Sequence, residues 1–156
     1  MARYHDFPDR INLIMGELGD LNRRQGQWAE ARRYYCLSIA VSRRIVITDQ
    51  ATVRTMRLNL ADVTERLSDY TQALHYANQG LLFSQKAHSL EDLRAAYDVL
   101  ARAHAQRKNW AAAYQAQLRF NTYDDSLTGT NVSRRTAALR FNQEVNQHRA
   151  QLLLLG

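Results

Sequence analysis

A pattern of leucine, small and aromatic residues recurs three times along this chain of 156 residues. Each copy has a leucine followed at once by glycine or alanine, an aromatic residue ten positions after the leucine, and an alanine three positions after the aromatic residue. The copies begin at Leu18, Leu60 and Leu100, so the intervals between them are 42 and 40 residues. Such intervals are typical of chains built from stacked copies of one supersecondary unit, and they restrict the fold to a repeat architecture.

The residues of each copy predict two helices joined by a tight turn. Before the first turn, apolar residues form one helical stripe: Ile11, Ile14, Met15, Leu18 and Leu21. The small residue after each leucine lets a second helix come close. An aromatic residue is expected to wedge between the two helices of each unit: Trp28, Tyr70 and Trp110. Gly26 can take a positive φ at the helix end, and Ser68 and Lys108 occupy the equivalent turns.

These units resemble the tetratricopeptide repeat. The small-residue and aromatic positions match from about Asn12 to Phe120, and the first unit adds Gln25-Gly26, Glu30-Ala31 and Tyr34-Tyr35. The chain departs from the family in its spacing of 40–42 residues, where about 34 is usual, and in lacking a proline at the end of each unit. The longer spacing is similar to that of repeats common in bacterial signalling proteins. The resemblance implies an all-α, right-handed α-solenoid of three helix hairpins that binds proteins or peptides.

The helical pattern divides the chain into a lead-in, three repeats and a last helix. Residues 1–9 are the expected lead-in, and 10–127 hold repeats at about 10–47, 50–88 and 91–125. The expected helices of these repeats run over about 10–25, 28–46, 50–67, 70–87, 89–107 and 110–124. Thr48 or Asp49 is expected to cap the third helix, and Ser89 begins the fifth. Residues 128–156 are the linker and C-terminal helix, with the break expected over 124–130 and the helix from about 132 to 155.

The C-terminal segment carries a heptad seam in place of a fourth repeat. Its members are spaced 3, 4, 3, 4 and 3 residues apart: Ala138, Phe141, Val145, His148, Leu152 and Leu155. One interpretation is a helix that caps the open edge of the third repeat. The other is a helix that mediates dimerisation or coupling to an output domain. The segment from Tyr123 to Leu153 also resembles the connector between repeat arrays and diguanylate cyclase or histidine kinase output domains, which favours the second interpretation.

The sequence holds no pattern typical of an enzyme. It has no Ser-His-Asp signature, no G-x-S-x-G, no phosphate-binding glycine loop and no H-E-x-x-H, so we expect no catalysis, cofactor or metal. Cys36, the single cysteine, excludes an internal disulfide and fits a reducing compartment. We expect both Cys36 and His104 to be packed inside the repeats. No signal peptide or long apolar run is present, so the expected location is the bacterial cytoplasm.

The net charge of +6 comes from 19 arginines and two lysines against 15 acidic residues, and it raises the question of nucleic-acid binding. Through the repeats the arginines alternate with Asp and Glu, as on an ordinary solvated surface. Only Arg134, Arg135, Arg140 and Arg149 are weakly opposed, and their spacing spreads them around the last helix. Charge distribution therefore argues against a nucleic-acid partner, which stays as a second alternative.

The first helix of each repeat is expected to line a concave groove that binds a protein or peptide. The repeat register predicts a mixed, polar lining for it: Glu17, Asp20, Arg24, Asn59, Asp62, Arg66, Asp98 and Arg102. This surface suits an extended peptide or a helix with both signs of charge. The sequence thus predicts a non-enzymatic binding module with a regulatory or sensor role in a signalling protein. The alternative is a simple assembly scaffold whose last helix is only a cap.

Overall fold

The computed structural model describes residues 6–44 and 49–155 of the chain. Within these ranges the backbone forms six α-helices: α1 (Asp6–Arg24), α2 (Trp28–Ser42), α3 (Gln50–Arg66), α4 (Tyr70–Ala87), α5 (Leu90–Gln106) and α6 (Trp110–Leu154). The prediction of an all-α repeat fold is confirmed. The expected lead-in of residues 1–9 is wrong from Asp6 onward, because α1 begins there; residues 1–5 lie outside the described ranges.

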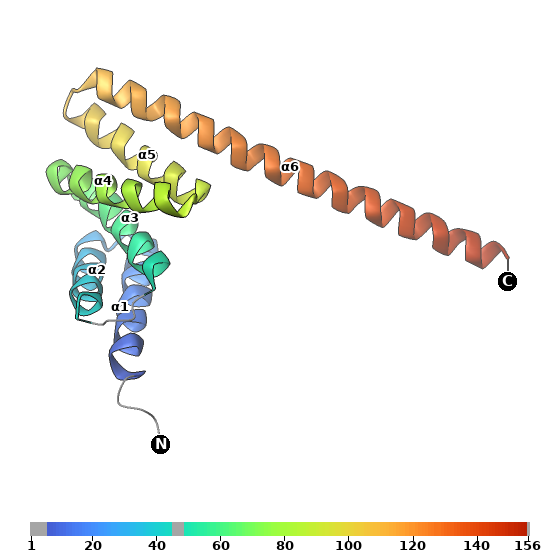
Figure 1. The fold of residues 1–156 in the computed structure, drawn as a ribbon, viewed down its shortest axis with the longest axis horizontal. Coiled ribbons are helices and arrows are strands. Elements are labelled where there is room, and N and C mark those ends of the chain that lie inside the picture. The colour runs from blue at the N-terminus through green and yellow to red at the C-terminus, as the bar shows by residue number, and fades with distance from the viewer. Residues whose placement is uncertain (1–5, 45–48, 156) are drawn as a thin grey trace.

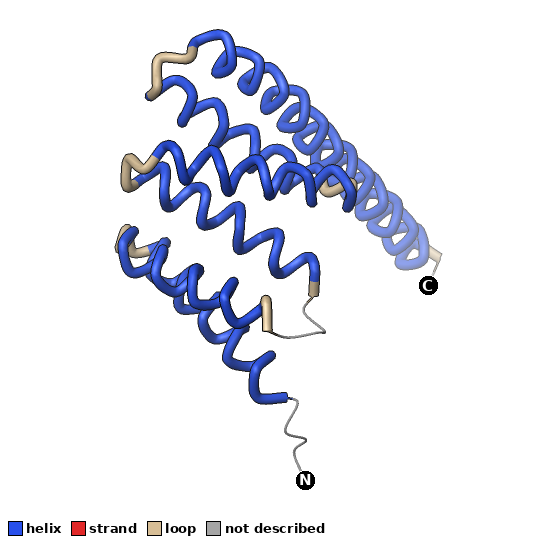
Figure 2. The backbone as a smooth tube through the Cα atoms, turned by 60° about the vertical axis from the view of Figure 1, so that its left-hand side comes forward, coloured by secondary structure: helices blue, strands red, loops and turns tan. Residues whose placement is uncertain are grey.

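The helices stack as three antiparallel pairs, α1 with α2, α3 with α4, and α5 with α6 (Figure 1). Each pair also packs on the next, through α2 against α3 and α4 against α5, and the first helices contact each other from α1 to α3 to α5. Figure 2 shows the resulting layers, one pair above another, with α6 running on beyond them. The order of contacts is that of a solenoid, in which each unit touches only its neighbours.

The three turns inside the pairs have one geometry. Gly26, Ser68 and Lys108 have φ of 72°, 62° and 59°, which places all three in the left-handed region. At each turn the next residue donates its backbone N–H to a carbonyl five residues back, as Gln27 does to Asn22 at 2.9 Å. The residue at positive φ also donates its N–H to the carbonyl three residues back, as Gly26 does to Arg23 at 3.1 Å. These two hydrogen bonds form the Schellman motif, which satisfies carbonyls that a helix end leaves without partners. The prediction that Ser68 and Lys108 replace glycine in equivalent turns is confirmed.

Helix starts are set by side-chain caps. Asp49 accepts hydrogen bonds from the backbone N–H groups of Ala51 and Thr52, so the prediction of a cap at Asp49 is confirmed, while Thr48 lies outside the described residues. Asp69, Ser89 and Asn109 cap α4, α5 and α6 in the same way, each accepting from the backbone three residues on. The side chain of Gln27 makes no capping hydrogen bond, so the backbone turn before α2 determines where this helix begins.

Small residues let the helices approach closely, as the repeat pattern predicts. A Cβ added at Gly19 would lie 2.6 Å from the Tyr35 ring, and one added at Gly80 would collide with Leu58. Alanines fill much of the remaining core, and several are fully buried: Ala31, Ala61, Ala73, Ala77, Ala96 and Ala103. Alanine has little side-chain entropy to lose and favours helix, so this core gains its stability from close backbone packing.

The aromatic residue at the turn packs against the core in two of the three units. Trp28 and Tyr70 are half-buried against the core, but Trp110 is 66 % exposed. The prediction of a wedge is therefore wrong for Trp110. Trp28 contacts the following unit, because the Arg66 guanidinium lies 5.5 Å from the centre of its ring. In the described part of the chain, no further helix pair packs on the third pair to cover Trp110.

Helix α6 runs without a break through the expected linker. The prediction of a break over 124–130 is wrong, because Trp110–Leu154 is one helix of 45 residues. Hydroxyl groups that commonly compete with helix bond instead to carbonyls four residues back: Thr122, Ser126, Thr130 and Thr136. Tertiary contacts also hold the segment to α5, since Tyr123 stacks on Tyr97 at 5.8 Å between ring centroids and Arg94 donates to Asp124 at 3.0 Å.

Candidate functional site

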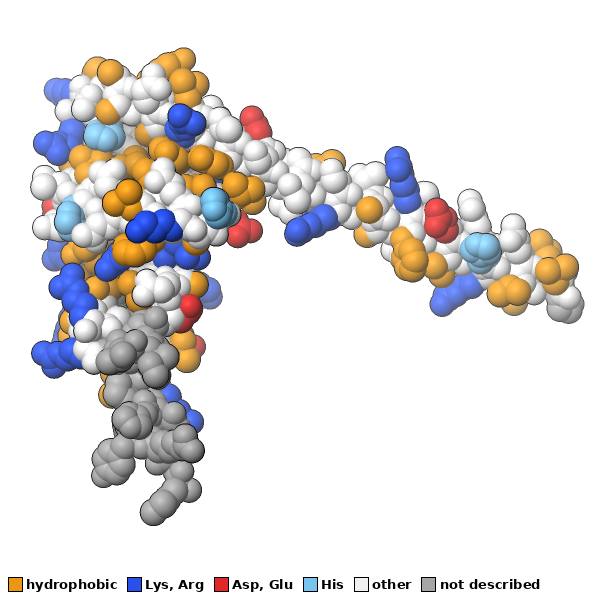
Figure 3. All heavy atoms as spheres, in the orientation of Figure 1, with side chains coloured by type: hydrophobic (Ala, Val, Ile, Leu, Met, Phe, Trp, Pro, Cys, Tyr) orange, Lys and Arg blue, Asp and Glu red, His pale blue; other side chains and the backbone are white. Residues whose placement is uncertain are grey.

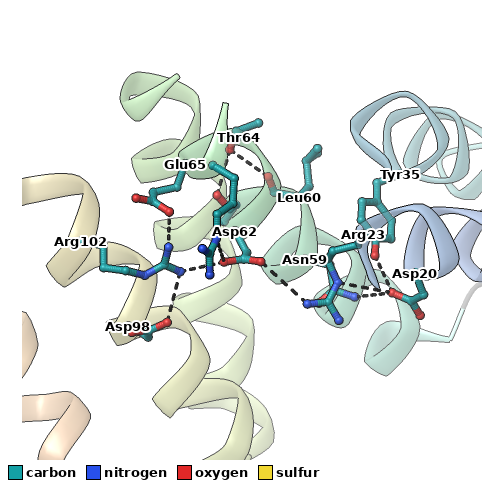
Figure 4. Close-up of polar contacts among 12 residues, drawn as sticks. Asp20, Arg23, Tyr35, Asn59, Leu60, Asp62, Thr64, Glu65, Asp98 and Arg102 are labelled. Atoms are coloured by element: carbon teal, nitrogen blue, oxygen red, sulfur yellow. Dashed lines mark hydrogen bonds and ion pairs between the residues drawn. The ribbon is translucent and has the colours of Figure 1, made fainter. Parts of the chain in front are cut away.

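A polar network connects the first helices of all three repeats (Figure 4). Its centre is Arg102 on α5, whose guanidinium donates to Asp62 at 2.7 Å and also to Glu65, both on α3. The same guanidinium reaches Asp98 at 3.2 Å, one turn earlier on its own helix. Burial by itself would lower the pKa of Arg102, but the hydrogen bond with Asp62 and the charges of Asp98 and Glu65 outweigh it, so the pKa is raised. Arg102 is thus firmly held in its charged form.

The network continues from α3 to α1. Asp62 also lies 3.8 Å from Arg23, whose other nearest carboxylate oxygen is that of Asp20 at 4.0 Å. Asp20 accepts a hydrogen bond from the Tyr35 hydroxyl at 2.5 Å and one from the Asn59 amide at 3.0 Å. Figure 4 shows the side chains of this half pointing toward one another from α1, α2 and α3. Each neighbouring pair of repeats is therefore tied by charge-assisted hydrogen bonds across its first helices.

A cavity of about 270 Å³ opens beside this network, between α1 and α3. Glu17, Asp20 and Asn59 give it a polar side, and Leu13 and Met56 give it an apolar side. Leu13 is 56 % exposed although it is a large apolar residue. The cavity can therefore receive a side chain that combines an apolar stem with a polar or basic end.

The structure brings together six of the eight residues predicted to line the groove. These six residues, which come from all three repeats, belong to the network of ion pairs and hydrogen bonds: Asp20, Asn59, Asp62, Arg66, Asp98 and Arg102. Glu17 lines the cavity, and Arg24 is exposed at the end of α1. Neither Glu17 nor Arg24 has an ion-pair partner within the described ranges. The repeat register thus predicted which of these residues lie close together, but it did not predict the ion pairs and hydrogen bonds between them.

Three members of the network were missed by sequence reasoning: Arg23, Tyr35 and Glu65. Arg23 and Glu65 occupy equivalent positions in successive units, 42 residues apart, and carry opposite charges. This reversal of charge at equivalent positions of two repeats was the sequence signal that could have indicated ion pairs between neighbouring repeats. Sequence reasoning identified Tyr35 only as part of the family resemblance, but its hydroxyl reaches across the pair to Asp20.

Tyr35 couples the core to the network. Its ring is fully buried against Gly19, while its hydroxyl donates to Asp20. Burial, followed by the hydrogen bond to Asp20 and that residue's negative charge, raises the pKa of the Tyr35 hydroxyl well above its usual range. The phenol therefore stays protonated and remains a donor at any physiological pH.

The two residues expected to be packed inside the repeats differ in outcome. Cys36 is exposed on α2, so the prediction that it is buried is wrong; partial burial still raises the pKa of its thiol, and Arg32 opposes that shift. His104 is half-buried, and burial, aided by Arg107, lowers the pKa of its imidazole. Among the residues that the structure describes, no group of three His, Cys, Asp or Glu is placed to hold a metal ion.

The residues of the heptad seam lie in the last part of α6, the end of the helix that carries hydrophobic side chains on its surface in Figure 3. We call residues 135–155 the arm. Phe141, Leu152 and Leu155 are 65 %, 70 % and 85 % exposed, Ala138 is exposed, and Val145 is half-buried. The arm leads away from the repeats, so the interpretation of this segment as a cap on the third repeat is wrong (Figure 1). It fails because α6 is straight through the expected linker and cannot fold back.

The fold and this surface define the class of protein: an all-α repeat solenoid with a polar face made by its first helices. The family model of the tetratricopeptide repeat matches residues 10–86, which span the first two helix pairs. Residues 10–86 are therefore similar to the tetratricopeptide repeat, whose repeats typically serve as protein-interaction modules, and the third pair has the same turn geometry. A search of curated proteins gave no match to the chain. The resemblance of the C-terminal segment to a connector finds no support in these comparisons.

No helix within 6–44 and 49–155 has both the length and the apolar character needed to cross a membrane.

Proposed function

We propose that this chain is a regulatory protein-binding module of a bacterial signalling system in the cytoplasm. In this proposal the face formed by α1, α3 and α5 binds an extended peptide or a helix of a partner protein. The arm then joins the module to a second copy or to an output domain. The observation that carries the proposal is the continuous polar network across all three first helices, with a cavity at one end.

The network favours a ligand with charges of both signs. It contains the carboxylates of Asp20, Asp62, Glu65 and Asp98 and the guanidinium groups of Arg23, Arg66 and Arg102. Because most of these groups are already paired, they are held in place before a ligand arrives, which lowers the entropy cost of binding. The more exposed pairs, such as Arg23 with Asp20 and Arg66 with Asp62, contribute only about 0.2–1 kcal/mol each, so a ligand charge can replace one of their partners at small cost.

Arg23 is the member of the network best placed to change partners. Its Nε is buried and has no hydrogen-bond acceptor, and its two carboxylate neighbours lie at 3.8 and 4.0 Å. Both distances exceed those of good charge-assisted hydrogen bonds. A carboxylate or carbonyl oxygen of a ligand, entering between α1 and α3, would accept a hydrogen bond from this guanidinium.

Selection of binding peptides from a random library on the full chain tests the proposal. Peptides selected on the wild type are expected to lose at least tenfold in affinity for the Glu17→Arg variant, because Glu17 lines the cavity and has no ion-pair partner to lose. Glu30→Arg on α2 makes the same change of charge away from the groove and serves as the control, because the ion pair with Arg33 that it removes is exposed to solvent. Equal binding by both variants would contradict the groove as the site. Steeply salt-dependent DNA binding that Arg134→Glu and Arg135→Glu abolish would favour the nucleic-acid alternative.

A further inference from the structure

The arm of α6 presents an apolar seam to solvent along one side of an isolated helix. A helix needs tertiary packing for most of its stability, and one without it is marginal in water. The arm extends roughly 30 Å beyond the repeats by helical geometry, and of its seam residues only Val145 is as much as half-buried. Its apolar side therefore requires a partner surface of the same length and shape.

The heptad register of the seam identifies positions that flank it. With Ala138, Val145 and Leu152 at position a, Phe141, His148 and Leu155 occupy position d. In this register Glu144 is at position g and Arg149 at position e of the following heptad. Neither has an ion-pair partner in the described part of the chain, so both charges are free to pair across an interface.

Position g of one helix meets position e of the next heptad on its partner only when two helices lie parallel and in register. That geometry places Glu144 of each chain beside Arg149 of the other, five residues further on, and forms two symmetric ion pairs. An antiparallel arrangement brings g beside g and e beside e, so Glu144 and Arg149 find no opposite charge. The pattern of charges thus selects one orientation and one register.

We infer that the partner of the arm is the arm of a second copy of this chain, in a parallel, in-register, two-stranded coiled coil. The inference rests on the proposed function and specifies the partner and orientation that the proposal leaves open. His148 at a d position places two imidazoles opposite each other inside the seam, which weakens the dimer and makes it reversible. Parallel pairing also leaves both sets of repeats at the same end, so two grooves can bind a bivalent ligand together.

Sedimentation equilibrium of the full chain over a dilution series, combined with charge exchange, tests the register. Arg149→Glu and Glu144→Arg are each expected to weaken dimerisation roughly tenfold, because two attractive pairs become two repulsive ones. The double variant restores opposite charges and is expected to return to within about threefold of the wild type. Arg140→Glu, at the outward c position, makes the same charge change as Arg149→Glu and is the control. A double variant as weak as either single variant overturns the register.

Disulfide cross-linking tests the orientation. In a chain with Cys36→Ser, Ala138→Cys and Leu152→Cys are each expected to form a disulfide-linked dimer alone, since a positions meet in every parallel layer. Gln143→Cys, at an outward f position, is the control and is expected to stay unlinked. Cross-links formed only in a mixture of Ala138→Cys and Leu155→Cys chains would show antiparallel pairing, which overturns this inference and leaves dimerisation intact. A monomer at every concentration would overturn the dimerisation in the proposed function as well, without touching the groove.

Discussion

At the scale of single residues, the contact of Gly19 with Tyr35 decides how closely α1 and α2 can pack. Gly19→Ala adds a methyl group 2.6 Å from the Tyr35 ring, which cannot swing away because its hydroxyl is bonded to Asp20. Overpacking of this kind is expected to lower the free energy of unfolding by about 1–3 kcal/mol. Urea denaturation followed by circular dichroism measures the change.

Gly129→Ala is the matched control for that substitution. Gly129 lies inside α6 with no neighbouring atom within 4 Å of an added Cβ. Alanine is therefore expected to raise the helicity of α6 and its stability by about 0.5–1 kcal/mol, through helix propensity alone. Equal effects of the two alanines would contradict the close approach of α1 and α2.

The buried hydroxyl of Tyr35 predicts a loss of stability in alkali. Because the folded state raises the pKa of Tyr35, the unfolded chain loses this proton first, near pH 10. Its contribution is complete below that pH. Above it, the free energy of unfolding is expected to fall by up to about 1.4 kcal/mol per pH unit until the folded-state pKa is reached. Stability measured from pH 8 to 11 shows the slope.

Two variants isolate this effect. Tyr35→Phe is expected to lose about 1–2 kcal/mol at neutral pH, because Asp20 loses a donor, and to show a shallower alkaline slope. Tyr34→Phe, which changes the neighbouring tyrosine, is expected to keep the slope of the wild type. A slope that survives Tyr35→Phe unchanged would assign it to other tyrosines, of which Tyr76 and Tyr97 also have a pKa raised by burial.

At the scale of helices and turns, each of the three equivalent turns has a residue in the left-handed region. Adding a glycine at such a position and removing one are therefore expected to change the free energy of unfolding in opposite directions. Lys108 holds φ of 59° with a side chain that disfavours this region, whereas Gly26 holds 72° at no steric cost. Lys108→Gly is therefore expected to raise the free energy of unfolding by about 0.5–1 kcal/mol, and Gly26→Ala to lower it by about 1 kcal/mol. Thermal denaturation of both variants measures the two signs, and a shift in the same direction would contradict a shared turn geometry.

Most helix boundaries could be predicted from the sequence because local chemistry sets them. The turns at Gly26, Ser68 and Lys108 and the caps at Asp49 and Ser89 lie where the residue types indicate. The continuity of α6 could not be predicted in this way. Its segment 124–130 has turn-forming residues, but contacts distant in sequence, such as Arg94 with Asp124, outweigh that local preference.

At the scale of the whole molecule, register predicted which face carries the polar residues, because equivalent positions of stacked units lie side by side. It could not predict their pairing. Whether Arg102 faces solvent or Asp62 depends on the distance and rotation between two units, and these follow from the side chains packed between them. The groove was therefore predicted as a set of separate charges, whereas the structure has them as one network.

The separation of arm and repeats predicts that each can be changed without the other. Beyond Arg134 the side chains of α6 are exposed apart from Val145, and α6 packs against α5 only nearer its start. A chain ending at Arg135 is thus expected to unfold at the temperature of the full chain when both are dilute, while losing all dimerisation. Dilution matters, because assembly by itself raises the apparent stability of the longer chain.

A shortened chain that melts many degrees lower or precipitates, even at low concentration, would show that the arm shields the third repeat after all. Retained dimerisation would instead place the interface on the repeats, where Trp110 and Tyr114 of α6 are exposed.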